Sequence, residues 1–204
     1  MAVTCPIDLD TLKLRQEIQS IYARVATEPN GAFHFHCGPA YAATLLGYDA
    51  GALAALPSGS TESFAGVANP HRIAPIRLGA TVADIGCGAG MDLLLAAQAV
   101  GPAGRAIGVD MTEAMAARAR AGARSLGLEQ VEVRLGDALS LPIASGTIDA
   151  VLSNGVLNLT PDKHAAFSEV FRVLKPGGES LYGDIVVGTE LEESLRTDVD
   201  LWTG

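Results

Sequence analysis

The chain has 204 residues, of which 49% are hydrophobic and 18% charged, a balance that supports one buried core and excludes a disordered, tail-like protein. Its formal net charge of −9 comes with only three lysines, so no long basic stripe is present to neutralise phosphates and no nucleic-acid partner is expected. No apolar run is long enough for a membrane span, and the first residues lack the pattern of a secretion signal, so we expect a cytoplasmic protein.

The N-terminal part of the chain begins with an expected helix. Apolar residues recur at helical intervals over 8–26, with charged residues between them, which predicts an amphipathic helix. From 28 to 74 the pattern weakens into glycine, proline, serine and aromatic residues, with one short helical stretch over 50–56. We therefore separate residues 1–74, an N-terminal helix with a lid or substrate-side segment, from residues 75–204, a second domain.

Beyond residue 80, short apolar runs alternate with longer helical ones, which is typical of parallel strands joined by crossover helices in an α/β fold. The second and third helices have Thr112 and Thr160 as expected N-caps, and a last helical face is expected over 189–202. The expected strands are 81–85, 105–110, 131–135, 147–153 and 179–187, and the helices between them are 90–100, 113–126 and 161–174.

A glycine-rich loop follows the first of these strands and opens a helix. Gly86 and Gly88 let a ligand approach the backbone where helix N–H groups face it, and Asp110 ends the next strand, where a carboxylate accepts ribose hydroxyls. The spacing is GxGxG, with Met91 where a dinucleotide motif would have glycine or alanine. The loop therefore favours S-adenosylmethionine (SAM), whose ammonium Asp84 could meet.

A further carboxylate closes the third expected strand. Asp137, between Gly136 and Ala138, could accept an adenine amino hydrogen beside the ribose site. An aspartate after a strand is also a common helix N-cap, so its position beside Asp110 carries the functional interpretation.

Taken together, residues 80–187 resemble a class I SAM-dependent methyltransferase, with DIGCGAG, GVDMT, GDA and RVLKPGG in order. The fuller string, from FAGVANPH through VLSNGVLNLTPDK, is similar to the arsenite methyltransferase group and extends the resemblance to 64–187. The resemblance implies a Rossmann-like sheet with helices on both faces, SAM as cofactor and a small-molecule methyl acceptor. The residues that it implies for SAM binding are Asp84, Gly86, Cys87, Gly88, Asp110, Met111, Asp137, Ala138, Asn154 and Val156.

Two features depart from the arsenite methyltransferase group. That group holds arsenic on three thiolates, whereas this chain has Gly155 in place of the cysteine of an SNCV motif and no cysteine after Cys87. The group's sheet also has a sixth and a seventh strand, which the seventeen residues after Val187 cannot supply. We therefore expect a fragment, a shortened homologue, or a homo-oligomer or partner chain that covers the open edge of the fifth strand.

The candidates for catalysis are His36, Cys37 and Asn154. A carbon or oxygen acceptor would need a base such as His36, whereas a sulfur or metalloid acceptor would need none. His34, His36 and Cys37 could ligate metal, but without a second His or Cys cluster we expect no metal site.

Tyr41 and Tyr48 flank that segment and could either turn an aromatic face toward the sulfonium or pack in the core. The alternative functions are a quinone-type C-methyltransferase and a SAM-binding protein or subunit without turnover.

Overall fold

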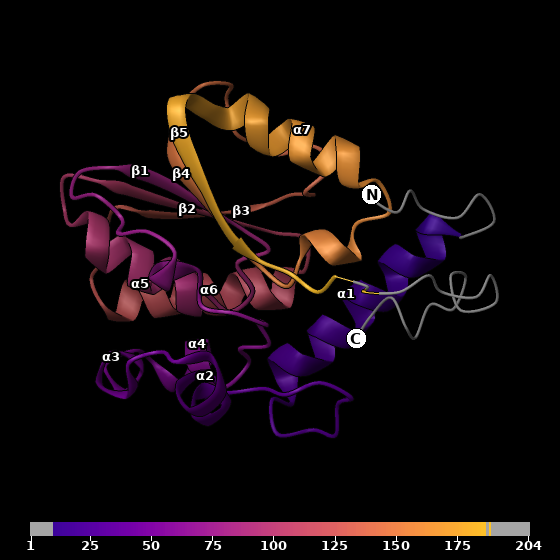
Figure 1. The fold of residues 1–204 in the computed structure, drawn as a ribbon. Helices are drawn as coiled ribbons and strands as arrows, with labels where there is room; N and C mark the ends of the chain where they lie inside the picture. Colours follow the sequence, from indigo (N-terminus) through magenta and orange to yellow (C-terminus); the bar gives the residue numbers. More distant parts are fainter. Residues whose placement is uncertain (1–9, 187, 189–204) are drawn as a thin grey trace.

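The structure, a computed structural model that describes residues 10–186 and 188, is organised around a five-stranded parallel sheet (Figure 1). The strand order is β3-β2-β1-β4-β5, so the chain leaves β1 in one direction and β4 in the other. In such sheets a crevice opens at the carboxyl ends of the two central strands. The strands are β1 Thr81–Ile85, β2 Arg105–Asp110, β3 Val131–Leu135, β4 Ile148–Asn154 and β5 Leu174–Gly183.

Helices cover both faces of this sheet. Figure 1 shows α7 (Lys163–Val173) on one face, and α5 (Met91–Val100) and α6 (Glu113–Ser125) on the other. β1, β2 and β4 have near-continuous apolar runs because both of their faces are buried. The core between the sheet and α7 includes Ile107 and Val173.

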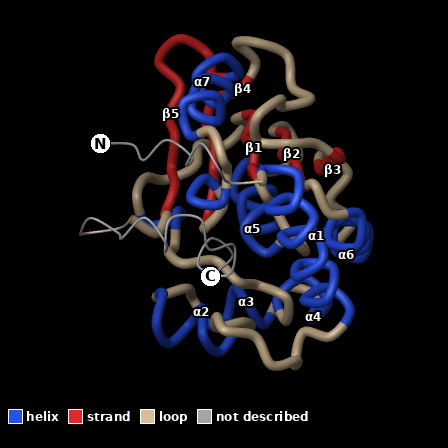
Figure 2. The backbone as a smooth tube through the Cα atoms, turned by 90° about the vertical axis from the view of Figure 1, so that its right-hand side faces the viewer, coloured by secondary structure: helices blue, strands red, loops and turns tan. Residues whose placement is uncertain are grey.

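The N-terminal part forms a helical layer. In Figures 1 and 2, α1 (Thr11–Thr27) lies beside the carboxyl ends of the strands, and three short helices lie beyond α5 and α6. Asp10 caps α1 by accepting hydrogen bonds from the amides of Leu12 and Lys13, at 3.1 and 3.0 Å. The short helices are α2 Pro39–Leu46, α3 Ala50–Ala54 and α4 Ser58–Thr61.

The α/β fold and its parallel sheet were predicted correctly, and three of the five strands have the predicted bounds. β4 lies one residue later than predicted. β5 begins at Leu174 rather than 179, because Leu174 pairs with Ile148 directly after α7 and a register shift then carries the strand past Pro176. The helix predicted at 189–202 lies outside the described residues.

The predicted N-cap of the third helix was wrong. Asp162 caps α7 by accepting a hydrogen bond from the amide of Ala165, at 2.9 Å. Thr160 instead follows a 3-10 turn, η2 (Leu157–Leu159), and its hydroxyl donates to the Leu157 carbonyl. Thr112 does stand at the N-cap position of α6, although its side chain makes no capping hydrogen bond.

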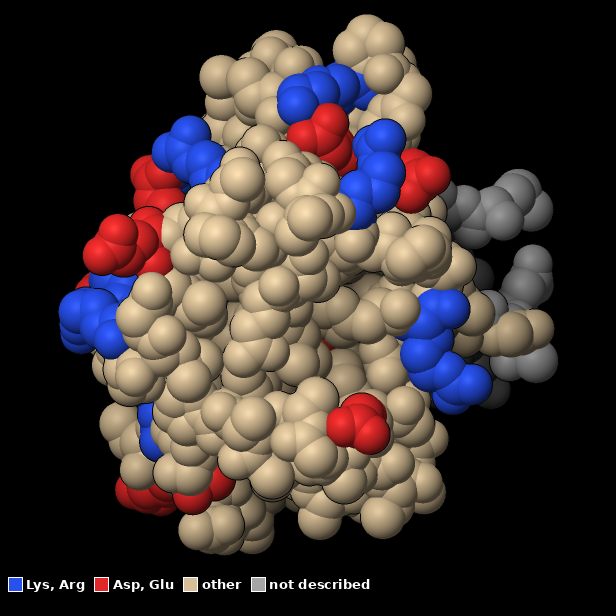
Figure 3. Space-filling model, turned by 90° about the vertical axis from the view of Figure 1, so that its left-hand side faces the viewer, with Lys and Arg blue, Asp and Glu red and all other residues tan. Residues whose placement is uncertain are grey.

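Among the described residues the sheet ends at β5, and apolar side chains are exposed beside that edge. Phe171 on α7 is 82% exposed, and Tyr182 on β5 is 40% exposed and contacts the ring of Phe167. A partner chain over this edge remains a prediction. On the face opposite α1, shown in Figure 3, basic side chains lie beside acidic ones at the margins and leave a broad uncharged centre. No helix in the described part of the chain is long and apolar enough to cross a membrane.

Candidate functional site

A pocket of about 230 Å³ opens at the carboxyl edge of the sheet, where β1 and β4 lie side by side. Both parts of the chain contribute to it, because α1 and the segment after α4 face the loops that follow the strands. The lining comes from six stretches, which lie within 11–22, 60–66, 84–92, 109–115, 136–139 and 154–161.

The glycine loop forms the floor of this pocket. Gly88 has a φ of +52°, and a Cβ added there would meet nothing within 4 Å, so the loop presents open backbone. Gly86 has a φ of +68°, and a Cβ there would collide with the side chain of Val156. The loop is tied to β2, because the Gly86 amide donates to the Val109 carbonyl at 2.7 Å and the Gly88 amide donates to Asp110 Oδ2 at 2.8 Å. Glycine is therefore required at Gly86 by close packing, and at both positions by the left-handed backbone.

Three buried carboxylates surround the loop. Asp84, Asp92 and Asp110 are 2%, 6% and 8% exposed. Burial raises the pKa of Asp84 well above its ordinary value, and the charges of Asp92 and Asp110 raise it further. Burial also raises the pKa of Asp110, although hydrogen bonds from the backbone of Thr112 and Gly88 oppose that shift. Asp84 Oδ2 has no hydrogen-bond partner, so this group of carboxylates suits a cationic ligand.

Asp137 lies at the rim of the pocket. Its Oδ1 accepts a hydrogen bond from the Leu139 amide at 2.9 Å, and its Oδ2 lies 2.6 Å from Nη2 of Arg15 on α1. It closes a turn after β3 and caps no helix. The role of Asp137 toward adenine remains a prediction.

The structure brings the ten predicted cofactor-binding residues to this one pocket. Their contact with a cofactor stays a prediction. They come from the ends of β1, β2, β3 and β4, so the pocket includes more than the glycine loop. The ten are Asp84, Gly86, Cys87, Gly88, Asp110, Met111, Asp137, Ala138, Asn154 and Val156.

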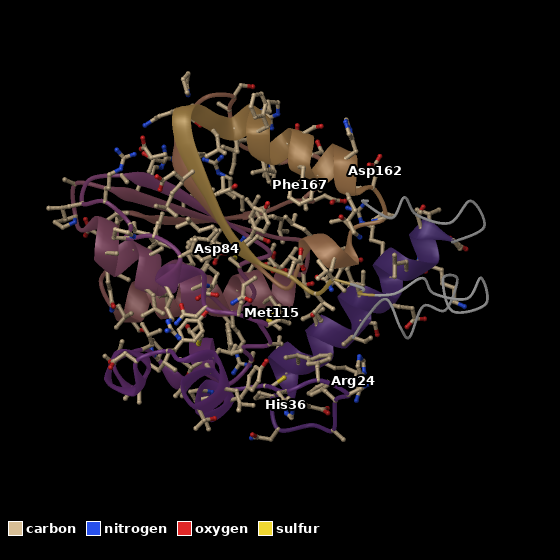
Figure 4. The ribbon with its side chains drawn as sticks, viewed as in Figure 1. Arg24, His36, Asp84, Met115, Asp162 and Phe167 are labelled. Carbon is tan, nitrogen blue, oxygen red and sulfur yellow. The ribbon has the colours of Figure 1, made fainter. Side chains whose placement is uncertain are left out.

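The catalytic candidates are divided by the structure. Asn154 lines the pocket, whereas His36 and Cys37 do not. In Figure 4, Asp84 lies at the end of β1 and His36 lies apart from it, on the segment that follows α1. The His36 ring packs 5.1 Å from the ring of Tyr41, and burial raises the pKa of the Cys37 thiol. Their positions give no support to a catalytic role.

Neither tyrosine considered for the sulfonium lines the pocket. Tyr41 packs against His36, and the hydroxyl of Tyr48, which is buried, donates to Asp92 Oδ1 at 2.7 Å. No group of three His, Cys, Asp or Glu residues is arranged for a metal ion in the part of the chain that the structure describes.

Sequence reasoning missed the residues that close the pocket. Leu14, Ile18 and Tyr22 of α1 line it, together with Phe64 and the acidic Asp92. Burial, with the charges of Asp110 and Cys37 adding to it, raises the pKa of Tyr22 to about 12, so its phenol stays protonated. The apolar face of the predicted first helix was visible in the sequence, but nothing there indicated that this face lies over the glycine loop.

Comparison with known proteins agrees with this geometry. The family model described as "Methyltransferase domain" matches residues 76–203. An arsenite methyltransferase of Halobacterium salinarum is 42% identical over 159 residues, which make up 78% of this chain and 40% of that protein. A demethylmenaquinone methyltransferase of Bacillus cytotoxicus is 38% identical over 108 residues, 53% of this chain and 46% of that protein.

Among solved structures, an arsenic(III) SAM methyltransferase from Chlamydomonas reinhardtii is 37% identical, with a TM-score of 0.66 over 71% of this chain and 51% of that one. The chain spans about two fifths of the length of the arsenite methyltransferases of Halobacterium salinarum and Aquipseudomonas alcaligenes. The family match extends over more than half of the chain, and the parallel sheet and the pocket are those of the class I fold. The chain therefore belongs to the methyltransferase domain family, for which the cofactor is SAM.

Proposed function

We propose that this protein transfers the methyl group of SAM to a small-molecule acceptor in the pocket. The observation that carries the proposal is Asp84 Oδ2, a buried carboxylate oxygen without a partner that lies beside the open backbone of Gly88. An ammonium group at this position would supply the missing hydrogen bond and offset the burial of the charge.

The other carboxylates fit the remaining parts of the cofactor. Asp110, at the end of β2, would accept the ribose hydroxyls, and Asp137 would accept an adenine amino hydrogen. Met111 and Ala138 line the pocket beside these two carboxylates, where they would pack on the nucleoside. The pocket residues thus fit SAM, which supplies an electrophilic methyl group on a sulfonium when it is bound.

The chain's own residues would act by positioning and by excluding water. The loop at Gly86 and Gly88 and the carboxylate of Asp84 would orient the methionine end, and Tyr22 and Phe64 would close the pocket from the side of α1. An aromatic face beside a sulfonium is also attractive electrostatically. Holding the two reacting atoms in line supplies most of the acceleration expected for a displacement of this kind.

Among the described residues, the pocket lining offers carboxylates, but no histidine, as possible general bases. The titratable side chains of the described lining are four aspartates, Arg15, Tyr22 and Cys87, and none of them is a histidine. Four carboxylates against one guanidinium also disfavour an anionic acceptor. The charge of the lining therefore favours a neutral acceptor.

Two acceptor classes follow from the relatives' names. A trivalent arsenic compound is the acceptor that the name of the Halobacterium salinarum relative suggests, but Cys87 is the one cysteine among the described lining residues, so the pocket alone provides no set of thiolates. A quinone-type acceptor is the second candidate, because the lining includes Leu14, Ile18, Phe64 and Leu159, which offer apolar surface.

Calorimetric titration with SAM and, separately, with NAD tests the proposal. We expect SAM to bind and NAD not to bind, and we expect Asp84→Asn to weaken SAM binding at least about tenfold, since it removes a charge-assisted hydrogen bond at constant volume. Asp49→Asn is the matched control, because Asp49 is an exposed cap of α3 away from the pocket.

Methyl transfer from radiolabelled SAM to arsenite with glutathione, or to a short-chain naphthoquinol, then separates the acceptors. Binding of NAD in place of SAM would overturn the proposal. Binding of SAM without transfer to any acceptor would instead favour a SAM-binding protein without turnover.

A further inference from the structure

One buried carboxylate of the pocket lining is held by residues from three separate segments. Asp92, in the first turn of α5, accepts hydrogen bonds from the Tyr48 hydroxyl at 2.7 Å and from Asn154 Nδ2 at 3.0 Å. Nε2 of His71 lies 3.1 Å from the same carboxylate. A buried carboxylate is stable only when donors replace the water it has lost, and these three side chains do so.

Asn154 connects this carboxylate to the backbone of the N-terminal segment. Its Oδ1 accepts hydrogen bonds from the amides of Val67 and Ala68, at 2.8 and 3.0 Å. Its Nδ2 donates to the Ala68 carbonyl at 2.8 Å as well as to Asp92, and lies 3.1 Å from the Tyr48 hydroxyl. The polar atoms of this amide are therefore occupied within the protein, which argues against Asn154 as a catalytic residue.

The backbone that Asn154 holds continues directly into one wall of the pocket. Phe64, Ala65 and Gly66 line the pocket and precede the two bonded amides. A Cβ at Gly66 would collide with Asn154 Nδ2, so wall and amide are in direct contact. A change in the direction of the Asn154 amide would therefore move this wall.

The wall faces the half of the pocket that the cofactor would leave open. If Asp110 and Asp137 bind the nucleoside, as in the proposed function, the acceptor must lie toward the end of β4, between Phe64–Gly66 and the residues after Asn154. The position of the wall then sets the distance and angle at which the acceptor meets the methyl group. Small displacements at this point affect the rate strongly, because the reaction depends on alignment.

We propose that Tyr48, His71 and Asp92 are positioning residues that fix the acceptor wall Phe64–Gly66 through Asn154, and that Tyr48 also does so through the Ala68 carbonyl, which lies 3.1 Å from its hydroxyl. None of the four side chains reacts. Tyr48 and Asp92 contact the Asn154 amide directly and His71 acts through Asp92, and together they keep the amide in the direction that bonds Val67 and Ala68. The inference rests on the proposed function for the identity of the acceptor side, and on the hydrogen bonds alone for the coupling between Tyr48 and the wall.

The primary test is Tyr48→Phe, which removes one hydroxyl at nearly constant volume, with Tyr41→Phe as the matched control. The Tyr41 hydroxyl makes no hydrogen bond among the described residues, and its side chain does not line the pocket. In Tyr48→Phe we expect amide hydrogen exchange at Val67 and Ala68, followed by NMR, to accelerate about tenfold, because a hydrogen bond to a charged group is lost. The control should leave both amides as in the unchanged protein.

The functional test compares the SAM dissociation constant with kcat in the same variant. We expect the SAM dissociation constant of Tyr48→Phe to stay within about twofold of the unchanged protein, while kcat with arsenite and glutathione falls about tenfold. A merely structural role would instead raise exchange across β1 to β4 and weaken SAM binding together with turnover.

His71 provides a rescue experiment. Gln at position 71 keeps a side-chain N–H that can donate to Asp92, whereas Leu does not. We expect His71→Gln to retain the protection of Val67 and Ala68 within about threefold, and His71→Leu to lose about tenfold. Equal effects of the two variants would remove His71 from the proposal.

Unchanged exchange at Val67 and Ala68 in Tyr48→Phe overturns the inference, as does accelerated exchange with unchanged kcat. Failure of the proposed function is a separate observation, namely the absence of SAM binding by the unchanged protein. The exchange experiment needs neither cofactor nor acceptor, so it decides the coupling between Tyr48 and the wall in either case.

Discussion

The pocket has two sides that differ in how the sequence specifies them. On the floor, the contacts stay within one strand–helix–strand unit, since Gly86 and Gly88 adopt left-handed backbone conformations and Asp110, 22 positions after Gly88, bonds the loop from the adjacent strand. The opposite wall consists of Phe64–Gly66 together with α1, and the contacts that hold it join residues far apart in sequence, such as Tyr48 with Asn154, 106 positions away. A sequence motif is enough to identify the floor, whereas the wall can be identified only from the tertiary structure.

This difference suggests that the floor determines the affinity for the cofactor and that the wall determines the alignment of the acceptor. Open backbone and buried carboxylates on the floor provide the interactions that a charged cofactor needs. The wall offers mainly apolar surface and is held in place by hydrogen bonds between Asn154 and the backbone of Val67 and Ala68. If the comparison holds, changes to the floor should alter cofactor affinity, and changes to the wall should alter stability or turnover.

The largest effect is expected from Leu14→Ala. Leu14 is 1% exposed and packs with Ile18 and Leu159 where α1 closes the pocket. Its truncation should lower the free energy of unfolding by about 3 kcal/mol through lost burial and a cavity. Urea denaturation measures this loss. Leu45→Ala is the control, since Leu45 is 68% exposed, and it should change stability by less than about 0.5 kcal/mol.

An unchanged stability in Leu14→Ala would mean that α1 opens independently of the sheet, and that the wall is a separate unit rather than part of the core.

Asp110→Ala tests the floor. The carboxylate bonds the amides of Gly88 and Thr112 at 2.8 Å each, and we expect it also to bind ribose. Its loss should weaken SAM binding about 100-fold by calorimetry, a change of about 2.7 kcal/mol, while most of the stability remains. SAM affinity within about threefold of the unchanged protein would contradict the assignment of affinity to the floor.

The sequence predicted the floor because its determinants are local. Gly86 and Gly88 followed by a helical pattern, and Asp110 at the end of the next apolar run, identify a loop and a carboxylate without any knowledge of packing. The bounds of β1 and β2 were predicted for the same reason, since buried parallel strands are short apolar runs between clear breaks. β3 is only partly buried, and its alternation of apolar and charged residues marked it as a strand.

The wall could not be predicted because each of its residues has an ordinary local interpretation. Asp92 is an acidic residue in the first turn of a helix, where it would be favourable without any ligand. Tyr48 follows α2 and His71 lies in a 3-10 turn over Pro70–Arg72, and only their convergence on Asp92 distinguishes them from core and turn residues. Conversely, His36 and Cys37 were predicted as catalytic candidates because of their residue types, but they lie outside the pocket lining.

A smaller effect should appear in the pH dependence of stability. Burial, with the charges of Asp92 and Asp110, raises the pKa of Asp84 above 3.8, so the folded protein holds this proton more tightly than the unfolded chain does. The stability that the protonated group provides is complete below the unfolded pKa and is lost as the pH rises toward the folded pKa. Urea denaturation across this range should show a steeper decline for the unchanged protein than for Asp84→Asn.

Bound SAM should reverse this trend, because its ammonium favours the ionised carboxylate, and binding should then release protons in calorimetry with buffers of different ionisation enthalpy. Parallel pH profiles for the two proteins would instead show that the burial of Asp84 is already compensated without a ligand.

The smallest effect is expected where the two sides meet, at the ion pair between Arg15 of α1 and Asp137 of the floor. Its atoms lie 2.6 Å apart, but the Arg15 side chain is 49% exposed, so solvent screens the attraction. Arg15→Gln should change the free energy of unfolding by less than about 1 kcal/mol. Because the change also releases an Asp137 oxygen for the adenine amino group, SAM affinity should stay the same or rise by about twofold. A clear loss of SAM affinity would place Arg15 among the cofactor ligands and assign part of α1 to the floor. The variant with the smallest expected effect therefore tests whether α1 contributes to cofactor binding.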